Sequence, residues 1–147
     1  MQLAGTRFSE TSVIAVNYVI TFPDYPAEIR ASAGTLAGVS SFDLSFSSNE
    51  IFITADSLGV LVAMNPAALK ANLSDLKKGG ILIVNSDNFA ENDLRKAEYS
   101  ENLLETGELS DFNVVQIPIT KLTLKAVEEK GLSYLDGSHN KNFFALG

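Results

Sequence analysis

The chain of 147 residues contains no cysteine and no tryptophan, and its only histidine is His139. Without cysteine the chain forms no disulfide and offers no thiolate ligand to zinc or to an iron–sulfur cluster. A Ser–His–Asp arrangement would have to use His139, and no serine lies in a nucleophile-elbow motif. His139 lies in a helix-start context, where capping or solvent exposure is the simpler interpretation. We therefore expect no metal-binding and no catalytic residues in this chain.

Long apolar runs and clusters of basic residues are also missing. No run approaches the ~20 residues that a membrane-spanning helix needs, and the first residues lack the pattern of a signal peptide. The formal net charge of −7 argues against nucleic acid as a partner, because nucleic-acid binding requires clustered Lys and Arg. There is no Walker sequence and no GxGxxG turn. We expect no membrane segment, no nucleic-acid partner and a cytoplasmic location.

The stretch of residues 58–84 indicates the fold class. Its two apolar runs, residues 60–64 and 81–84, are typical of strands buried on both faces of a parallel sheet. Between them, Asn65-Pro66 favours a helix start, because Asn is a preferred N-cap and Pro suits the first helical position. The predicted helix reaches Lys77-Lys78 and ends at Gly79-Gly80, which can supply a left-handed turn. The stretch therefore predicts a βαβ unit.

The other predicted elements extend this pattern along the chain. Helices are expected over residues 1–17, 90–99 and 120–130, with Leu122 and Ala126 facing inward in the last of them. Strands are expected over residues 18–22, 39–47 and 114–117, and residues 51–53 form a short strand or the lead-in to the βαβ unit. Residues 101–111 are interpreted as an acidic surface excursion, and residues 142–147 as the first turns of a buried helix. The fold class that follows is α/β: a single three-layer domain over residues 1–147, with a mostly parallel sheet, helices on both faces and the first strand missing.

Ligands of open parallel sheets bind beyond the carboxyl ends of the strands. This rule selects Asn65 and the run Asn85-Ser86-Asp87 as candidate site residues. Each has a simpler interpretation, because Asn65 is suited to capping a helix and Asn85-Ser86-Asp87 to shaping a turn. Both interpretations stay open at this point.

A second group of candidates follows the two prolines Pro23 and Pro26. Arg30, with Glu28 nearby, is able to clamp a carboxylate or phosphate, or else it is an ordinary surface residue in a local ion pair. Thr35, next to Gly34 in a segment of small residues, offers a hydroxyl and backbone amides to an anion, or else forms a plain turn. The residues alone thus indicate an α/β domain with a possible anion site and no catalytic constellation.

Several ordered motifs resemble one family, the 2-oxoacid:acceptor oxidoreductases, which include the pyruvate and 2-oxoglutarate ferredoxin oxidoreductases. The motifs are FPDYPAEIR at residues 22–30, AGTLAGVSSF at 33–42, VAMNP at 62–66 and KNFFALG at 141–147. They resemble the gamma domain, which in many members is fused to the front of the alpha subunit. The similarity covers essentially the whole chain.

The resemblance implies a component of an enzyme that decarboxylates a 2-oxoacid on thiamine diphosphate, passes electrons through iron–sulfur clusters to ferredoxin, and forms an acyl-CoA. The implied partners are the thiamine-binding alpha region, the beta subunit and ferredoxin. Thiamine diphosphate and the clusters are held elsewhere, and the gamma domain contributes docking and coenzyme A-side surface. The candidate cofactor-binding residues are Glu28, Arg30, Gly34, Thr35 and Asn65. The isolated chain is expected to be inactive.

Two departures from the family leave alternatives open. The family has a first strand and a glycine-rich turn ahead of the residues matching Met1-Gln2-Leu3, and a fused alpha subunit continues past Gly147. We therefore expect a piece cut at both ends. The alternatives are a free-standing nucleotide- or coenzyme A-binding α/β module without redox activity, and a truncated product without a function of its own.

Overall fold

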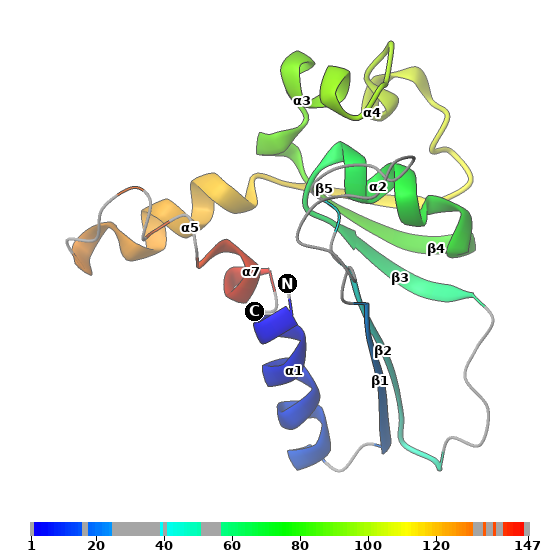
Figure 1. Ribbon diagram of the computed structural model, residues 1–147, viewed down its shortest axis with the longest axis vertical. Helices are drawn as coiled ribbons and strands as arrows, with labels where there is room; N and C mark the ends of the chain where they lie inside the picture. The colour runs from blue at the N-terminus through cyan, green and yellow to red at the C-terminus, as the bar shows by residue number, and fades with distance from the viewer. Residues whose placement is uncertain are drawn as a thin grey trace. The chain divides into compact units, whose positions relative to one another are not determined.

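The computed structural model describes residues 2–15, 18–24, 39, 41–50, 57–130, 134, 137 and 140–145. The chain divides into two compact units, one up to residue 56 and one over residues 57–145 (Figure 1). Each unit is described by itself below. In the part of the chain that is described, no helix has the length and apolar character needed to cross a bilayer.

The first unit consists of one helix and one antiparallel strand pair. Helix α1 spans Gln2–Ile14, strand β1 spans Tyr18–Asp24 and strand β2 spans Ser41–Ser47. The two strands pair in register from Tyr18 opposite Ser47 to Asp24 opposite Ser41. The predicted helix and both predicted strands of this region are confirmed. The predicted strand over residues 51–53 lies outside the described residues.

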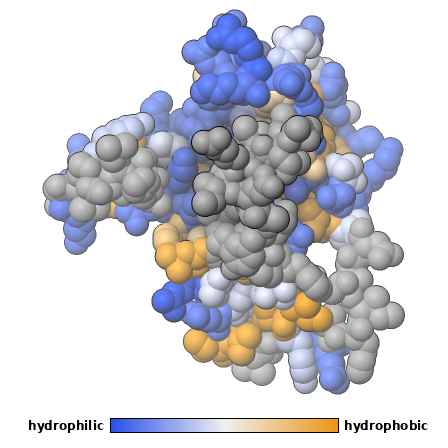
Figure 2. All heavy atoms as spheres, in the orientation of Figure 1, coloured by the Kyte–Doolittle hydropathy of each residue, from blue (hydrophilic) through white to orange (hydrophobic). Residues whose placement is uncertain are grey.

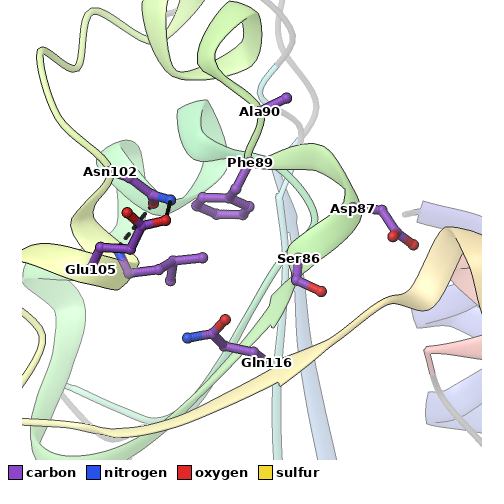
Figure 3. Close-up of a pocket in the computed structure, with 8 residues that line it drawn as sticks. Ser86, Asp87, Phe89, Ala90, Asn102, Glu105 and Gln116 are labelled. Carbon is purple, nitrogen blue, oxygen red and sulfur yellow. Dashed lines mark hydrogen bonds between the residues drawn. The ribbon is translucent and has the colours of Figure 1, made fainter.

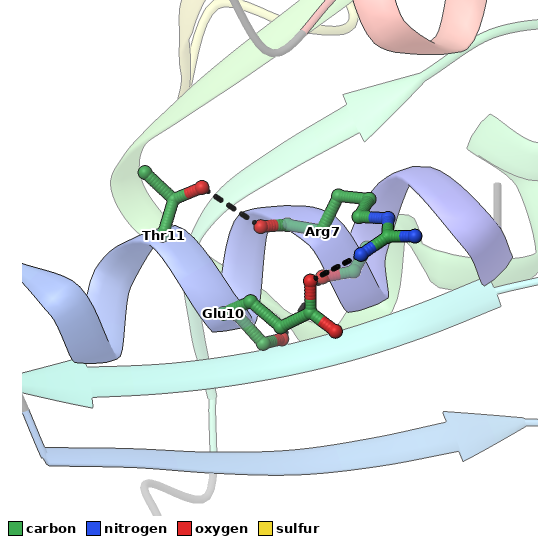
Figure 4. Close-up of polar contacts among 5 residues, drawn as sticks. Arg7, Glu10 and Thr11 are labelled. Carbon is green, nitrogen blue, oxygen red and sulfur yellow. Dashed lines mark hydrogen bonds and ion pairs between the residues drawn. The ribbon is translucent and has the colours of Figure 1, made fainter.

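Small side chains allow α1 to lie close to the strand pair. Ala4 and Ser12 are buried and lie eight residues apart on the same side of the helix. Phe8, midway between them, is half-buried. The Phe8 ring meets the Phe46 ring edge to face, with centroids 6.1 Å apart. On the exposed side, Arg7 Nη1 donates to Glu10 Oε2 at 2.8 Å and Thr11 Oγ1 donates to Arg7 O at 2.9 Å (Figure 4). Such a surface ion pair adds little stability.

The second unit contains a three-stranded parallel sheet in the order β3-β4-β5. The strands are β3 (Leu58–Ala63), β4 (Leu76–Asn85) and β5 (Asn113–Ile117). The helices are α2 (Pro66–Asn72), α3 (Glu91–Lys96), α4 (Leu103–Thr106), α5 (Ile119–Val127) and α7 (Lys141–Phe144), with 3₁₀ turns at Leu73–Asp75, Ser86–Asn88 and Glu128–Lys130. The predicted α/β class with a mostly parallel sheet is confirmed.

Helix α2 is shorter than predicted, and its glycines belong to the next strand. The helix ends at Asn72, and β4 begins at Leu76, so Lys77-Lys78 and Gly79-Gly80 lie in the strand rather than at a helix end. The reason is that Leu76 is a buried core residue paired with Leu58 of β3. The left-handed residue predicted here exists at Gly79, with φ of 74°, but it bends the strand where the β3–β4 pairing shifts register.

One face of the sheet and three helices enclose the core (Figure 1). Leu61 and Ala63 of β3 and Leu82 and Val84 of β4 point to this face and are buried. From the helical side the core receives buried side chains of α2, α3, α4 and the segments between them, namely Leu69, Phe89, Leu94, Leu103 and Leu109. The prediction of residues 101–111 as a surface excursion is therefore wrong for Leu103 and Leu109, whose burial anchors that segment.

The opposite face of the sheet carries Val60, Ile81 and Val115, which are 51%, 41% and 43% exposed. Strand alternation explains this stripe, because residues next to the buried Leu61 and Leu82 point the other way. Helices α2, α3 and α4 pack on the first face. A helix layer over this second face, as predicted from the sequence, stays a prediction.

The inward faces of the last two helices differ from those predicted. In α5 the buried residues are Ile119 and Thr123, whereas Leu122 and Ala126 are exposed. The helix begins at Ile119 directly after Pro118, and Ile119 and Thr123, four residues apart, are its buried residues. In α7 both Phe143 and Phe144 are exposed, at 41% and 38%, so the prediction of a buried helix is wrong for these two side chains.

Lys70 of α2 hydrogen-bonds to the C-terminal end of α3. Its Nζ donates to Ala97 O at 2.9 Å and to Glu98 O at 3.4 Å, and it lies 5.3 Å from the centre of the Tyr99 ring. A cation satisfies the unpaired carbonyls at a helix C-terminus and also attracts the face of an aromatic ring. Lys70 therefore holds α3 and Tyr99 over the core.

The Gly80→Ala substitution should destabilise the fold. An added Cβ would lie 2.7 Å from Lys77 O and 3.1 Å from Gly59 O, two backbone atoms that cannot rotate away. We expect a loss of about 1–3 kcal/mol in the free energy of unfolding, measured by urea denaturation. The matched control is Gly107→Asn, because Gly107 has φ of 78° with open space around it and Asn tolerates that conformation. Equal denaturation midpoints for the two variants would contradict this account.

Tyr99 should make stability fall at alkaline pH. Burial, and then the negative charge of Glu108, raise the pKa of Tyr99 above its ordinary value of 10.0. The unfolded chain therefore loses the phenol proton first, so the contribution of Tyr99 is complete below pH 10 and is lost as the pH rises through the folded pKa. Tyr99→Phe should remove this part of the pH dependence of unfolding. It should also remove a tyrosinate absorbance step above pH 10, and an unchanged difference spectrum would refute the assignment.

Candidate functional site

Asn65, the predicted site residue after β3, caps helix α2. Its Oδ1 accepts a hydrogen bond from Ala68 N at 2.8 Å, and its backbone is extended at φ −158° and ψ 167°. Pro66 follows at the first helical position and is buried. This geometry is that of an N-cap, so the simpler of the two interpretations accounts for Asn65.

The other predicted cofactor-binding residues, Glu28, Arg30, Gly34 and Thr35, lie outside the described residues, and so does His139. The structure therefore does not test whether they approach Asn65. They stay predictions.

Asn85, at the carboxyl end of β4, has no solvent-exposed surface and joins the strand to helix α5. Its Nδ2 donates to Thr120 Oγ1 at 3.0 Å, and its Oδ1 accepts from Thr120 N at 3.4 Å. Both ends of the buried amide are thus used within the protein, as buried polar groups require. Asn85 is a structural link between β4 and α5.

Asp87 and Asn88 make similar links from the turn that follows β4. Asp87 Oδ2 accepts from Lys121 N at 2.8 Å, which places a negative charge at the N-terminus of α5. Asn88 Nδ2 donates to Met64 O at 3.1 Å, which ties the ends of β3 and β4 together. The polar run that the sequence analysis selected therefore holds the carboxyl edge of the sheet in place.

A pocket of about 350 Å³ lies beside this edge, and we call it the β4 pocket (Figure 3). It is lined by Ser86, Asp87, Phe89, Ala90, Asn102, Leu104, Glu105 and Gln116. Two of these, Ser86 and Asp87, belong to the predicted run. Gln116 was missed, although its place one residue before the end of β5 satisfies the same strand-end rule. Asn102 and Glu105 belong to the start of helix α4 and not to a strand end, so the same rule does not select them.

Asn102 is the N-cap of α4 and is also bonded to the Glu105 side chain. Asn102 Oδ1 accepts from Leu104 N at 3.2 Å, and Asn102 Nδ2 donates to Glu105 Oε1 at 2.8 Å. These bonds fix the position of the Glu105 carboxylate at the wall of the pocket.

The lining of the β4 pocket is acidic and polar. It contains two carboxylates, three uncharged polar side chains and no Lys, Arg or His. A phosphate-bearing ligand would meet negative charge there without a cation to balance it. Among the described residues, no group of three or more His, Cys, Asp or Glu side chains is placed to hold a metal ion.

Asn85→Ala should destabilise the protein because it leaves the hydroxyl and the amide of Thr120 without their buried partner. We expect a loss of about 1–3 kcal/mol in the free energy of unfolding. The control is Asn92→Ala on the exposed side of α3, where we expect a change of about 0.5 kcal/mol or less. A chemical denaturation series compares the two, and equal losses would show that the Asn85–Thr120 link is not structural.

In comparisons with known proteins, the whole chain finds matches. Residues 1–147 match the family described as pyruvate ferredoxin/flavodoxin oxidoreductase. The chain is 54% identical over 147 residues to the 2-oxoglutarate oxidoreductase subunit KorA of Mycobacterium tuberculosis, with 100% of this chain and 22% of that protein covered. The chain therefore spans about a fifth of the length of this curated relative.

Two solved structures match most of the chain. The gamma subunit of a keto/oxoacid ferredoxin oxidoreductase from Geobacter sulfurreducens matches with a TM-score of 0.55 and 18% identity, covering 95% of this chain and 64% of that chain. The pyruvate oxidoreductase subunit PORC of Thermotoga maritima matches with a TM-score of 0.48 and 17% identity, covering 97% and 84%. The first of these supports the α/β architecture.

Proposed function

Because the chain belongs to the pyruvate ferredoxin/flavodoxin oxidoreductase family, we propose that it is the gamma-type domain of a 2-oxoacid:ferredoxin oxidoreductase. The observation that carries the proposal is the family match over all 147 residues, together with 54% identity to a 2-oxoglutarate oxidoreductase subunit. We take residues 1–147 as one domain of that enzyme, in line with the extent of the match. The first substrate to test is 2-oxoglutarate, because it is the substrate in the name of that relative.

The overall reaction consumes a 2-oxoacid, coenzyme A and two oxidised ferredoxins, and yields an acyl-CoA, carbon dioxide, a proton and two reduced ferredoxins. Thiamine diphosphate, when bound in such an enzyme, stabilises the carbanion left by decarboxylation. This chain does not fit the role of cluster carrier, because it has no cysteine to ligate iron. Its part in the reaction is therefore to supply surface to the domains that hold the cofactors.

The coenzyme A side of the proposal rests on Arg30 and its neighbours Glu28, Gly34 and Thr35. A guanidinium holds a phosphate through two parallel hydrogen bonds, and small residues allow close approach to the backbone. The β4 pocket is a poor alternative, because its carboxylates would repel the phosphates. Asn65 is the weakest of the five candidates, since its side-chain oxygen already caps α2.

The proposed partners are the thiamine-binding alpha region, the beta subunit and ferredoxin, and the proposed location is the cytoplasm, where soluble ferredoxin is reduced. The free-standing binding module is the less favoured function. All of this chain aligns within a protein more than four times as long, which supports a domain working next to others.

Copurification tests the proposal. The full-length gene product, expressed with the genes beside it, should bring down a partner that contains thiamine diphosphate and iron. The complex should reduce ferredoxin only when 2-oxoglutarate and coenzyme A are both present. A product that elutes alone and supports no 2-oxoacid oxidation with any neighbouring gene product would overturn the function.

In the complete enzyme, Arg30→Ala should raise the KM for coenzyme A by about tenfold, which is the loss expected for one charge-assisted hydrogen-bonding group. The KM for the 2-oxoacid should stay unchanged. The control is Arg95→Ala, which removes a guanidinium from the exposed face of α3. If Arg30→Ala and Arg95→Ala give the same kinetics and the same assembly, Arg30 is an ordinary surface residue.

A further inference from the structure

We propose that the β4 pocket binds the guanidinium group of an arginine side chain presented by a partner polypeptide. The proposal goes beyond the function given above, which assigns no ligand to this pocket. At about 350 Å³ the β4 pocket is at the small end of the range for ligand sites, which suits one side chain better than a cofactor.

The acceptor groups of the pocket outnumber its donors. Figure 3 shows Glu105, Phe89 and Gln116 around the same space, with Asp87 at the other side. Glu105 uses Oε1 to accept from Asn102, and no donor to its Oε2 occurs in the part of the chain that the structure describes. The exposed amide of Gln116 adds a carbonyl oxygen. A guanidinium has five N–H donors and no acceptor, so it matches this lining.

An anion does not match the same pocket. Helix α4 begins at its wall, and the amides of its first turn already have acceptors, because Leu104 N, Glu105 N and Thr106 N all donate to oxygens of Asn102. These three amides of α4 are therefore not available to an incoming phosphate or carboxylate, and Glu105 and Asp87 would repel it.

The apolar part of the lining fits the rest of an arginine side chain. Phe89 and Leu104 line the same pocket as Glu105, and Figure 3 shows the Phe89 ring on the side of the pocket where Glu105 lies. Arginine packs its three methylene groups on apolar surface and keeps its charged end at polar groups. Its planar, weakly hydrated fork can also donate to Glu105 on α4 and to Gln116 on β5 together, whereas the ammonium of lysine is a compact point charge.

The segment around the pocket would attract a basic partner. Residues 91–111 contain seven acidic and two basic side chains, a formal charge of −5, compared with −7 for the whole chain. In the orientation of Figure 1, Figure 2 shows hydrophilic side chains over α3. Clustered charge of one sign raises the rate of encounter with an oppositely charged surface and orients it. A positively charged polypeptide segment is thus the occupant that the charges favour.

The first test uses N-acetylarginine methylamide as the probe and the 147-residue chain labelled with ¹⁵N. The amide signals near Glu105 and Gln116 should shift, with a Kd on the order of millimolar for a single exposed contact of this kind. The citrulline analogue, which has the same shape without the charge, should cause no shift. Equal shifts with both probes, or none at the pocket with either, would overturn the guanidinium site.

Two matched variants locate the site. Glu105→Gln keeps a side-chain oxygen for Asn102 Nδ2 but removes the charge, so the Kd should rise about fivefold. Glu101→Gln removes an exposed charge two residues before α4 and should leave the Kd unchanged. Matching spectra of the unliganded variants check that both are folded. Equal effects of the two substitutions would contradict a specific site.

The second test addresses the occupant in the assembled complex. Glu105→Gln should lower the salt concentration at which the complex dissociates, and Glu101→Gln should not. If both complexes dissociate at the wild-type salt concentration, the arginine does not come from a partner polypeptide, and that part of the proposal is overturned. The spectroscopic test needs neither a complex nor turnover, so its failure is separate from a failure of the proposed oxidoreductase function.

Discussion

The structure of the larger unit depends on strand β4, which is paired on both sides. It hydrogen-bonds to β3 and to β5, and its inward side chains Leu82 and Val84 are fully buried beneath the helices. A strand in this position satisfies its backbone along its length and fixes the register of both neighbours. Gly79 links the first half of β4 to the start of β5. Gly79 N donates to Asp111 O at 2.8 Å, and Gly79 O accepts from Asn113 Nδ2 at 2.7 Å. Helices α2, α3 and α4 pack against the core to which this strand contributes Leu82 and Val84.

The carboxyl end of the same strand is held by polar links to its neighbours. In many open parallel sheets this edge holds the ligand. Here both ends of the Asn85 amide and one polar atom each of Asp87 and Asn88 are bonded to α5 or to the end of β3. Asp87 also lines the β4 pocket, whose polar groups are mostly acceptors. The surface role proposed for this chain agrees with its membership of a family of redox enzymes, since redox chemistry is carried by cofactors.

Local signals in the sequence predicted those features that are set by a few neighbouring residues. The Asn65-Pro66 cap, the apolar strands and the left-handed glycine at 79 are of this kind. The errors arose where distant contacts decide the outcome. Leu76 enters the sheet early because Leu58 is its partner, and Leu103 and Leu109 are buried because the core lies beneath them. The β4 pocket could not be predicted as a whole, because Glu105 and Gln116 meet only after α4 and β5 have packed. The anion site predicted around Arg30 rests on the residue types of that segment, and the described residues do not include it.

The stripe of Val60, Ile81 and Val115 has a practical consequence for handling the chain. Three β-branched side chains on neighbouring strands are each more than two-fifths exposed to water. Apolar strand surfaces of this kind promote association between copies, and the tendency grows with protein concentration. Purification should therefore start from dilute samples, or from coexpression with the genes next to that of this chain. For crystallisation, a mild detergent or a polar substitution in this stripe should reduce the association.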